Sequence, residues 1–155
     1  VVRQQFQYLV VPVKGGGARV TPEFWVAQLW RKVMGTHVLA VTGDRTGVLR
    51  VYAHADASLH TVGVLAINLG NVTATATIDI GASVTEHDEF RVTAYPEPTN
   101  LEATDAALNG ERLSLSPSGT LPDLVPITVS GAQLTVGPRS VTFAIFQDAW
   151  PGAGG

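Results

Sequence analysis

The stretch TPEFWVAQLWRKVMG, residues 21–35, predicts one α-helix and marks the point at which the pattern of the sequence changes. Thr21 is a suitable N-cap, Pro22 suits the first helical position, and Glu23 places a carboxylate at the positive end of the helix dipole. Gly35 is a typical residue just beyond a helix C-terminus. These signals bound the predicted helix at both ends.

The apolar residues of this helix form a broad stripe. Trp25, Leu29 and Val33 recur at a spacing of four, and Trp30 lies on an adjoining row. Tryptophan on such a stripe is more often a packing residue than a platform for carbohydrate stacking. We therefore expect Trp25, Leu29, Trp30 and Val33 to form a structural interface.

Beyond Gly35 the apolar residues alternate with a period of two, which is typical of strands. The predicted strands are Val38–Thr42, Val48–Ala55, Val62–Asn68, Ala74–Ile80, Phe90–Tyr95, Arg112–Leu115, Thr128–Val129 with Gln133–Val136, and Val141–Phe146. The composition agrees, because 21 valines, 16 threonines and 5 isoleucines favour a pleated sheet. Short strands separated by turn residues predict a mainly β fold, an antiparallel β-sandwich preceded by one strand and one α-helix.

The segment before the helix predicts a piece of a larger body. Val1–Val13 reads as one or two strands, and Lys14 and three glycines then form a loop. A lone strand and helix cannot bury their own faces, so we expect residues 1–35 to close something larger. Because the chain begins with Val1, we also expect a processed piece or a fragment. Residues 36–148 are the predicted sandwich domain, and residues 149–155 a disordered tail.

Composition excludes several classes of protein. The net charge of −3 and the 15% of charged residues argue against a nucleic-acid binder, which needs clustered Lys and Arg. The absence of cysteine excludes disulfides and cysteine zinc sites. No apolar run approaches the ~18 residues of a membrane-spanning helix.

The acidic residues do not form a recognisable catalytic pattern. Glu86, Asp88 and Glu89 cluster beside His87 between predicted strands, and we interpret this run as a solvated loop. Two further aspartates, Asp44 and Asp56, lie at predicted turns, where Asp bonds its own backbone. The sequence therefore predicts no catalytic residue.

The histidines, His37, His54, His60 and His87, lack metal-ligand spacing, so we expect neither a metal nor a cofactor. His37 and His54 are interpreted as hydrogen-bonded sheet residues. Asn71-Val72-Thr73 is a glycosylation sequon, and its place after Gly70 predicts an exposed turn.

Several short words of the sequence resemble, in the same order, those of heparanase-like proteins, glycoside hydrolase family 79. They are Val1–Gln4, Pro22–Trp25, Leu29–Thr36, Leu49–His54, Ala66–Thr73, Leu108–Gly110, Thr120–Pro122 and Val136–Phe146. The family consists of retaining glycosidases, many acting on glucuronosyl linkages. A (β/α)8 barrel carries two catalytic glutamates on earlier strands, and a β-sandwich packs on its side.

The resemblance implies a division of labour. Residues 1–35 would be the terminal strand, loop and helix of the barrel, and both catalytic glutamates would lie upstream of this chain. Retention requires two carboxylates held about 5 Å apart on rigid strands, and nothing in this sequence supplies such a pair. The implied partners are the upstream barrel and, through it, a polysaccharide. The implied location is extracellular or within the secretory pathway.

One segment departs from the family pattern. The loop after the last barrel strand of the family contains Gly-x-Gly-x-Tyr, whose tyrosine approaches the substrate. Here Phe6-Gln7-Tyr8 follows the strand without the glycines. Tyr8 is therefore the only substrate-binding candidate in this segment.

An alternative hypothesis is a β-sandwich module for assembly or carbohydrate binding. The unpaired backbone of Val1–Val13 would add to the edge of a second copy and form a homo-oligomer. Trp150, near the C-terminus, would be the candidate for stacking on a sugar.

Overall fold

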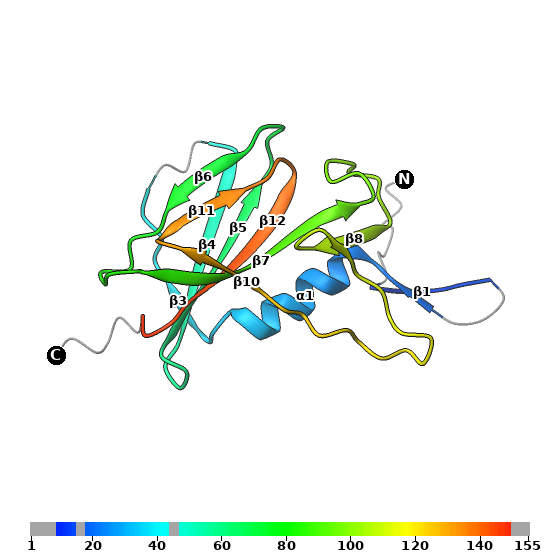
Figure 1. The fold of residues 1–155 in the computed structure, drawn as a ribbon, viewed down its shortest axis with the longest axis horizontal. Coiled ribbons are helices and arrows are strands. Elements are labelled where there is room, and N and C mark those ends of the chain that lie inside the picture. Colours follow the sequence, from blue (N-terminus) through cyan, green and yellow to red (C-terminus); the bar gives the residue numbers. More distant parts are fainter. Residues whose placement is uncertain (1–8, 15–17, 44–46, 150–155) are drawn as a thin grey trace, which may run out of the picture.

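The computed structural model describes residues 9–14, 18–43 and 47–149. One helix and twelve strands follow one another along this part of the chain (Figure 1). They are β1 (Val10–Pro12), β2 (Ala18–Val20), α1 (Pro22–Val33), β3 (His37–Leu39), β4 (Leu49–Asp56), β5 (Thr61–Asn68), β6 (Ala74–Thr77), β7 (Glu86–Tyr95), β8 (Asp105–Leu108), β9 (Glu111–Arg112), β10 (Ile127–Ser130), β11 (Gln133–Val136) and β12 (Ser140–Phe146). The predicted mainly β, antiparallel fold with one helix is confirmed.

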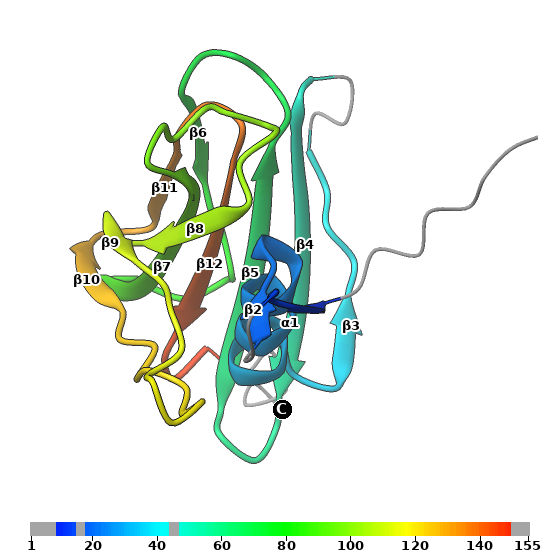
Figure 2. The same cartoon turned by 90° about the vertical axis from the view of Figure 1, so that its right-hand side faces the viewer.

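The strands form one large sheet and two small ones, and all strand pairs described are antiparallel. The large sheet has the order β3-β4-β5-β12-β7-β8-β9, and β10 also pairs with β7. The strand pair β6–β11 covers one face of this sheet, and β1–β2 forms a separate hairpin. α1 lies over the other face, in front of β4 and β5 in Figure 2.

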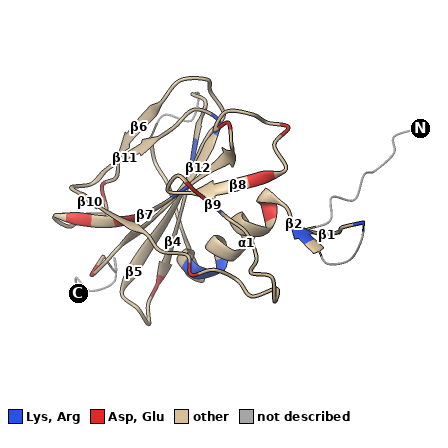
Figure 3. Cartoon of the chain, turned by 45° about the vertical axis from the view of Figure 1, so that its right-hand side comes forward, with Lys and Arg blue, Asp and Glu red and all other residues tan. Residues whose placement is uncertain are grey.

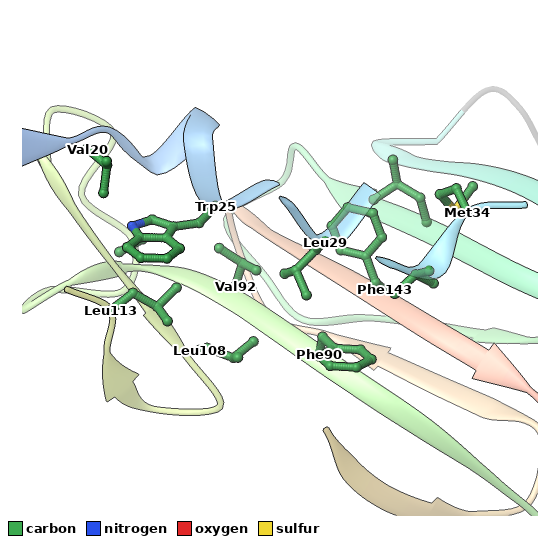
Figure 4. Packing of buried hydrophobic residues seen from close by; sticks show 12 residues of the cluster. Val20, Trp25, Leu29, Met34, Phe90, Val92, Leu108, Leu113 and Phe143 are labelled. Carbon is green, nitrogen blue, oxygen red and sulfur yellow. The ribbon is translucent and has the colours of Figure 1, made fainter. Parts of the chain in front are cut away.

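Two cores separate these layers, because alternate side chains of a strand point to opposite faces. On β5, Leu65 belongs to the core beneath α1, whereas Val64 and Ala66 belong to the core beneath β6–β11. The first core surrounds Trp25 and Leu29 with side chains from β7, β8 and β12 (Figure 4). The helix is therefore an integral layer of the structure.

The ends of α1 differ from the prediction in their chemistry. Thr21 occupies the N-cap position, but its side chain makes no capping bond, and its hydroxyl instead donates to the Leu9 carbonyl at 3.4 Å. The C-cap is Met34. Gly35 is required by a close approach, since a Cβ there would lie 2.2 Å from the carbonyl oxygen of Ala55.

The strand boundaries show where sequence reasoning failed. β2 and β8 were missed, and the predicted strand Arg112–Leu115 is reduced to β9. β7 begins at Glu86 rather than at Phe90, so the acidic run lies in a strand.

Both ends of the chain bear on the predictions made for them. Ala149, the first residue of the expected tail, is buried, and its N–H donates to the His60 carbonyl at 3.0 Å; residues 150–155 lie outside the described part. β1 pairs with β2 in this chain, so one edge of the strand expected within Val1–Val13 is occupied. No helix in residues 9–14, 18–43 and 47–149 has the length and apolar character needed to cross a membrane.

Candidate functional site

The predicted interface residues of α1 divide between two sides of the helix. Trp25, Leu29 and Val33 are buried against the large sheet, as their spacing of four requires. Trp30 is 40% exposed and lies outside that core. The helix therefore has a packed apolar row and, beside it, a large aromatic side chain that the described residues do not cover.

Trp30 is held in place by His54 of β4. The two rings meet edge to face, with centroids 5.2 Å apart and planes at 81°. His54 Nδ1 lies 2.8 Å from the Gly35 carbonyl oxygen. Because a carbonyl only accepts, Nδ1 donates this bond and ties the sheet to the end of α1. The prediction that His54 is a hydrogen-bonded sheet residue is confirmed.

An exposed face continues from Trp30 across β4 and β3. Tyr52 shares the face of His54 because residues two apart on a strand point the same way. Val38 lies directly opposite His54 in the β3–β4 register and shares that face too. Tyr52 is 47% exposed and Val38 77%. We call Trp30, Tyr52, His54 and Val38 the helix-side patch.

The β1–β2 hairpin is a second exposed apolar element. It extends away from the sandwich (Figure 3), and its side chains Leu9, Val10 and Val13 are exposed. Val20, at its base, is buried against the core beneath α1. A two-stranded hairpin is at best marginally stable in water, so a surface that covers these side chains would stabilise it.

The acidic run is buried, which corrects its interpretation as a solvated loop. Glu89 and His87 are both fully buried, and Glu89 Oε1 lies 2.9 Å from His87 Nε2. Arg91 Nε donates to the other oxygen, Oε2, at 2.5 Å. Both oxygens of Glu89 are thus occupied inside the sandwich, which suits a structural role rather than acid–base catalysis. The alternation of His87, Glu89 and Arg91 was the signal that sequence reasoning missed.

The remaining candidates are dispersed over the structure. Asn71 is exposed in the turn between β5 and β6. Asp56 caps its own turn as predicted, accepting bonds from the Ser58 and Leu59 N–H groups at 2.9 and 3.2 Å. A hydrogen bond from the Ser58 hydroxyl lowers the pKa of the Asp56 carboxyl below its ordinary value.

The prediction for Tyr8 cannot be placed, because it lies outside the described residues, as do Asp44 and Trp150. Among residues 9–14, 18–43 and 47–149, no group of three or more His, Asp or Glu side chains could hold a metal ion. The helix-side patch and the hairpin are therefore the surfaces on which a function can be argued.

Curated relatives support a specific origin for these surfaces. The chain is 32% identical over 124 residues to baicalin-β-D-glucuronidase of Scutellaria baicalensis, a match that covers 79% of this chain and 23% of that protein. It is 29% identical over 160 residues to heparanase-like protein 1 of Arabidopsis thaliana, covering 82% of this chain and 29% of the relative. The chain thus spans about a quarter of the length of the curated relatives it matches.

Solved structures show the same fold. An arabinose-bound α-L-arabinofuranosidase of glycoside hydrolase family 51 matches with a TM-score of 0.59 at 20% identity, over 93% of this chain and 22% of that one. A β-porphyranase of family 86 from Bacteroides plebeius matches with a TM-score of 0.56 at 13% identity, over 90% and 22% of the two chains. No protein-family model matches the sequence.

Proposed function

Since the chain is related to the heparanase-like glycoside hydrolases of family 79, we propose that it is the non-catalytic C-terminal region of a retaining glycosidase. In this proposal residues 1–35 complete the catalytic barrel as its last strand, loop and helix, and residues 36–148 form a supporting β-sandwich. The catalytic glutamates belong to the upstream barrel, which also binds the polysaccharide. The name of the Scutellaria baicalensis relative supports glucuronosyl linkages as the bonds that the whole enzyme cleaves.

The observation that carries this proposal is that α1 is apolar on more than the side it buries. Trp25 and Leu29 face the sheet, while Trp30 is exposed next to Tyr52 and Val38. A surface helix normally has one apolar stripe and a polar opposite face. Large exposed apolar side chains grouped in one region mark a surface that binds another body. A barrel wall packed on the helix-side patch would remove these side chains from water.

The partner is the barrel rather than a second copy, because α1 would be part of the barrel. The exposed apolar side chains of the β1–β2 hairpin, which lead into the same helix, agree with this arrangement. One body covering both the patch and the hairpin accounts for both exposed surfaces.

We also place the protein outside the cell or in the secretory pathway. Exposure of Asn71 in the β5–β6 turn leaves its sequon accessible to the glycosylation machinery of such a compartment.

The test compares this chain alone with the same chain joined to its barrel. The joined protein should hydrolyse a chromogenic β-D-glucuronide, and the chain alone should not. Trp30→Glu should lower the melting temperature of the joined protein but leave that of the chain alone nearly unchanged. Val72→Glu, an exposed apolar position in the β5–β6 turn, is the matched control. Hydrolysis by the chain alone, or equal effects of the two substitutions on the joined protein, would contradict the proposal.

A further inference from the structure

We propose that Arg19 of β2, assisted by Lys14 at the end of β1, binds the carboxylate of an acidic sugar at the mouth of the catalytic barrel. This inference rests on the proposed function and assigns substrate-charge specificity to side chains of the hairpin.

The place of the hairpin in the chain puts it at that mouth. In (β/α)8 barrels the segment between a strand and its following helix lies on the face where substrates bind. The hairpin leads directly into α1, the proposed last helix of the barrel. The Thr21 N–H donates to the Leu9 carbonyl oxygen at 3.0 Å, which closes the base of the hairpin where α1 begins. The hairpin would therefore stand at the substrate-binding face.

The fold determines the direction of Arg19. The neighbouring side chain, Val20, is buried in the core that contains Trp25 and Leu113. Because successive side chains on a strand point to opposite faces, Arg19 points away from that core, and it is exposed. Val11 is its partner in the antiparallel register. Arg19 is thus carried by an anchored strand but remains accessible to a ligand.

The charge of the hairpin suits an anion. The chain as a whole has a net charge of −3, yet its residues 9–20 include Lys14 and Arg19 and no Asp or Glu. Both basic side chains appear on the hairpin in Figure 3, apart from the sandwich. Neither forms an ion pair with another described residue. An arginine guanidinium is well suited to a carboxylate because its planar group can donate two parallel hydrogen bonds.

The experiment uses the enzyme that contains both the barrel and this chain. A chromogenic β-D-glucuronide is compared with its methyl ester, which lacks the negative charge; the ester is measured as a substrate or as a competitive inhibitor. Arg19→Gln should raise KM for the glucuronide on the order of tenfold, the loss expected for one charge-assisted hydrogen bond. It should leave KM or Ki for the ester unchanged.

Three further variants separate binding from structure. Arg19→Lys should restore part of the affinity for the glucuronide, and Lys14→Gln should raise KM by a smaller factor than Arg19→Gln. Arg112→Gln, which removes an arginine of β9 paired with Asp105, should change neither substrate.

Equal effects of Arg19→Gln on the glucuronide and its ester, or no effect on either, would overturn the inference while leaving the proposed function intact. Failure of the unaltered enzyme to hydrolyse the glucuronide would overturn the proposed function, and this inference with it.

Discussion

His87 and Glu89 lie two residues apart on β7 and share a hydrogen bond of 2.9 Å inside the sandwich, where neither side chain reaches solvent. His87 Nδ1 also donates to the Gly131 carbonyl oxygen at 2.7 Å, and the imidazole stacks on Phe146 with centroids 4.9 Å apart. The pair therefore ties β7 both to the turn before β11 and to the end of β12. A polar network of this kind is stabilising only while every member keeps its partner.

Replacing Glu89 should be strongly destabilising. Glu89→Leu leaves His87 and Arg91 without their shared acceptor, and loss of one partner from a buried pair costs about 3–5 kcal/mol. Glu89→Gln keeps one acceptor and should cost less. Urea unfolding measures both, with Glu86→Gln at an exposed position of the same strand as the control. Equal stability of Glu89→Leu and Glu86→Gln would show that the network does not stabilise the fold.

The two tryptophans of α1 should differ in their effect on the chain alone. Trp25→Ala removes a fully buried side chain and should lower the free energy of unfolding by about 3–5 kcal/mol. Trp30→Ala should cost only about 1 kcal/mol, because its ring keeps partial contact with water and packs mainly on His54. Denaturant unfolding distinguishes the two, and a larger loss for Trp30→Ala would contradict the placement of the helix.

Gly63 should tolerate no side chain. A Cβ at this position of β5 would lie 2.2 Å from the carbonyl oxygen of Val33, the last residue of α1. Gly63→Ala must push the helix from the sheet, and such overpacking typically costs about 1–3 kcal/mol. Gly47→Ala is the control, since nothing lies within 4 Å of its Cβ position. A thermal melt in which both variants match the unaltered chain would exclude this close contact.

Asn68 should be needed for the turn that carries the sequon. Its buried Nδ2 donates to the carbonyl oxygens of Val72, Val136 and Gly137 at 2.8, 3.0 and 2.9 Å, and its Oδ1 accepts from the Gly70 N–H at 2.9 Å. Asn68→Ala leaves these groups unsatisfied and should cost about 2–3 kcal/mol. The loss is measured by urea unfolding, and a change below about 0.5 kcal/mol would contradict it.

Asn71 should accept a glycan when the protein is made in a eukaryotic secretory host. Intact-mass measurement before and after removal of N-glycans should reveal one occupied site. Asn71→Gln and Thr73→Ala should each abolish it, and Thr75→Ala, outside the sequon, should not. An unchanged mass for the unaltered protein in that host would show that the exposed turn is not modified.

Local signals were enough to predict the elements that repeat a simple pattern. The spacing of Trp25, Leu29 and Val33 predicted the buried row of α1, because a helix brings residues four apart onto one side. Alternation predicted β5 and β12, whose period of two depends on the chain direction alone. β7 was predicted too short, because its first residues are polar and resemble a loop until their partners are known.

From the sequence alone came the helix with its buried row, the strand-rich sandwich and the relationship to heparanase-like glycosidases, which the curated relatives confirm. Only the tertiary structure decided that Glu89 is enclosed, that Trp30 faces outward and that Gly35 and Gly63 serve close contacts. The reason is that these outcomes depend on groups distant in the chain. The carbonyl that receives the His87 bond is 44 residues away, and no local pattern encodes its position.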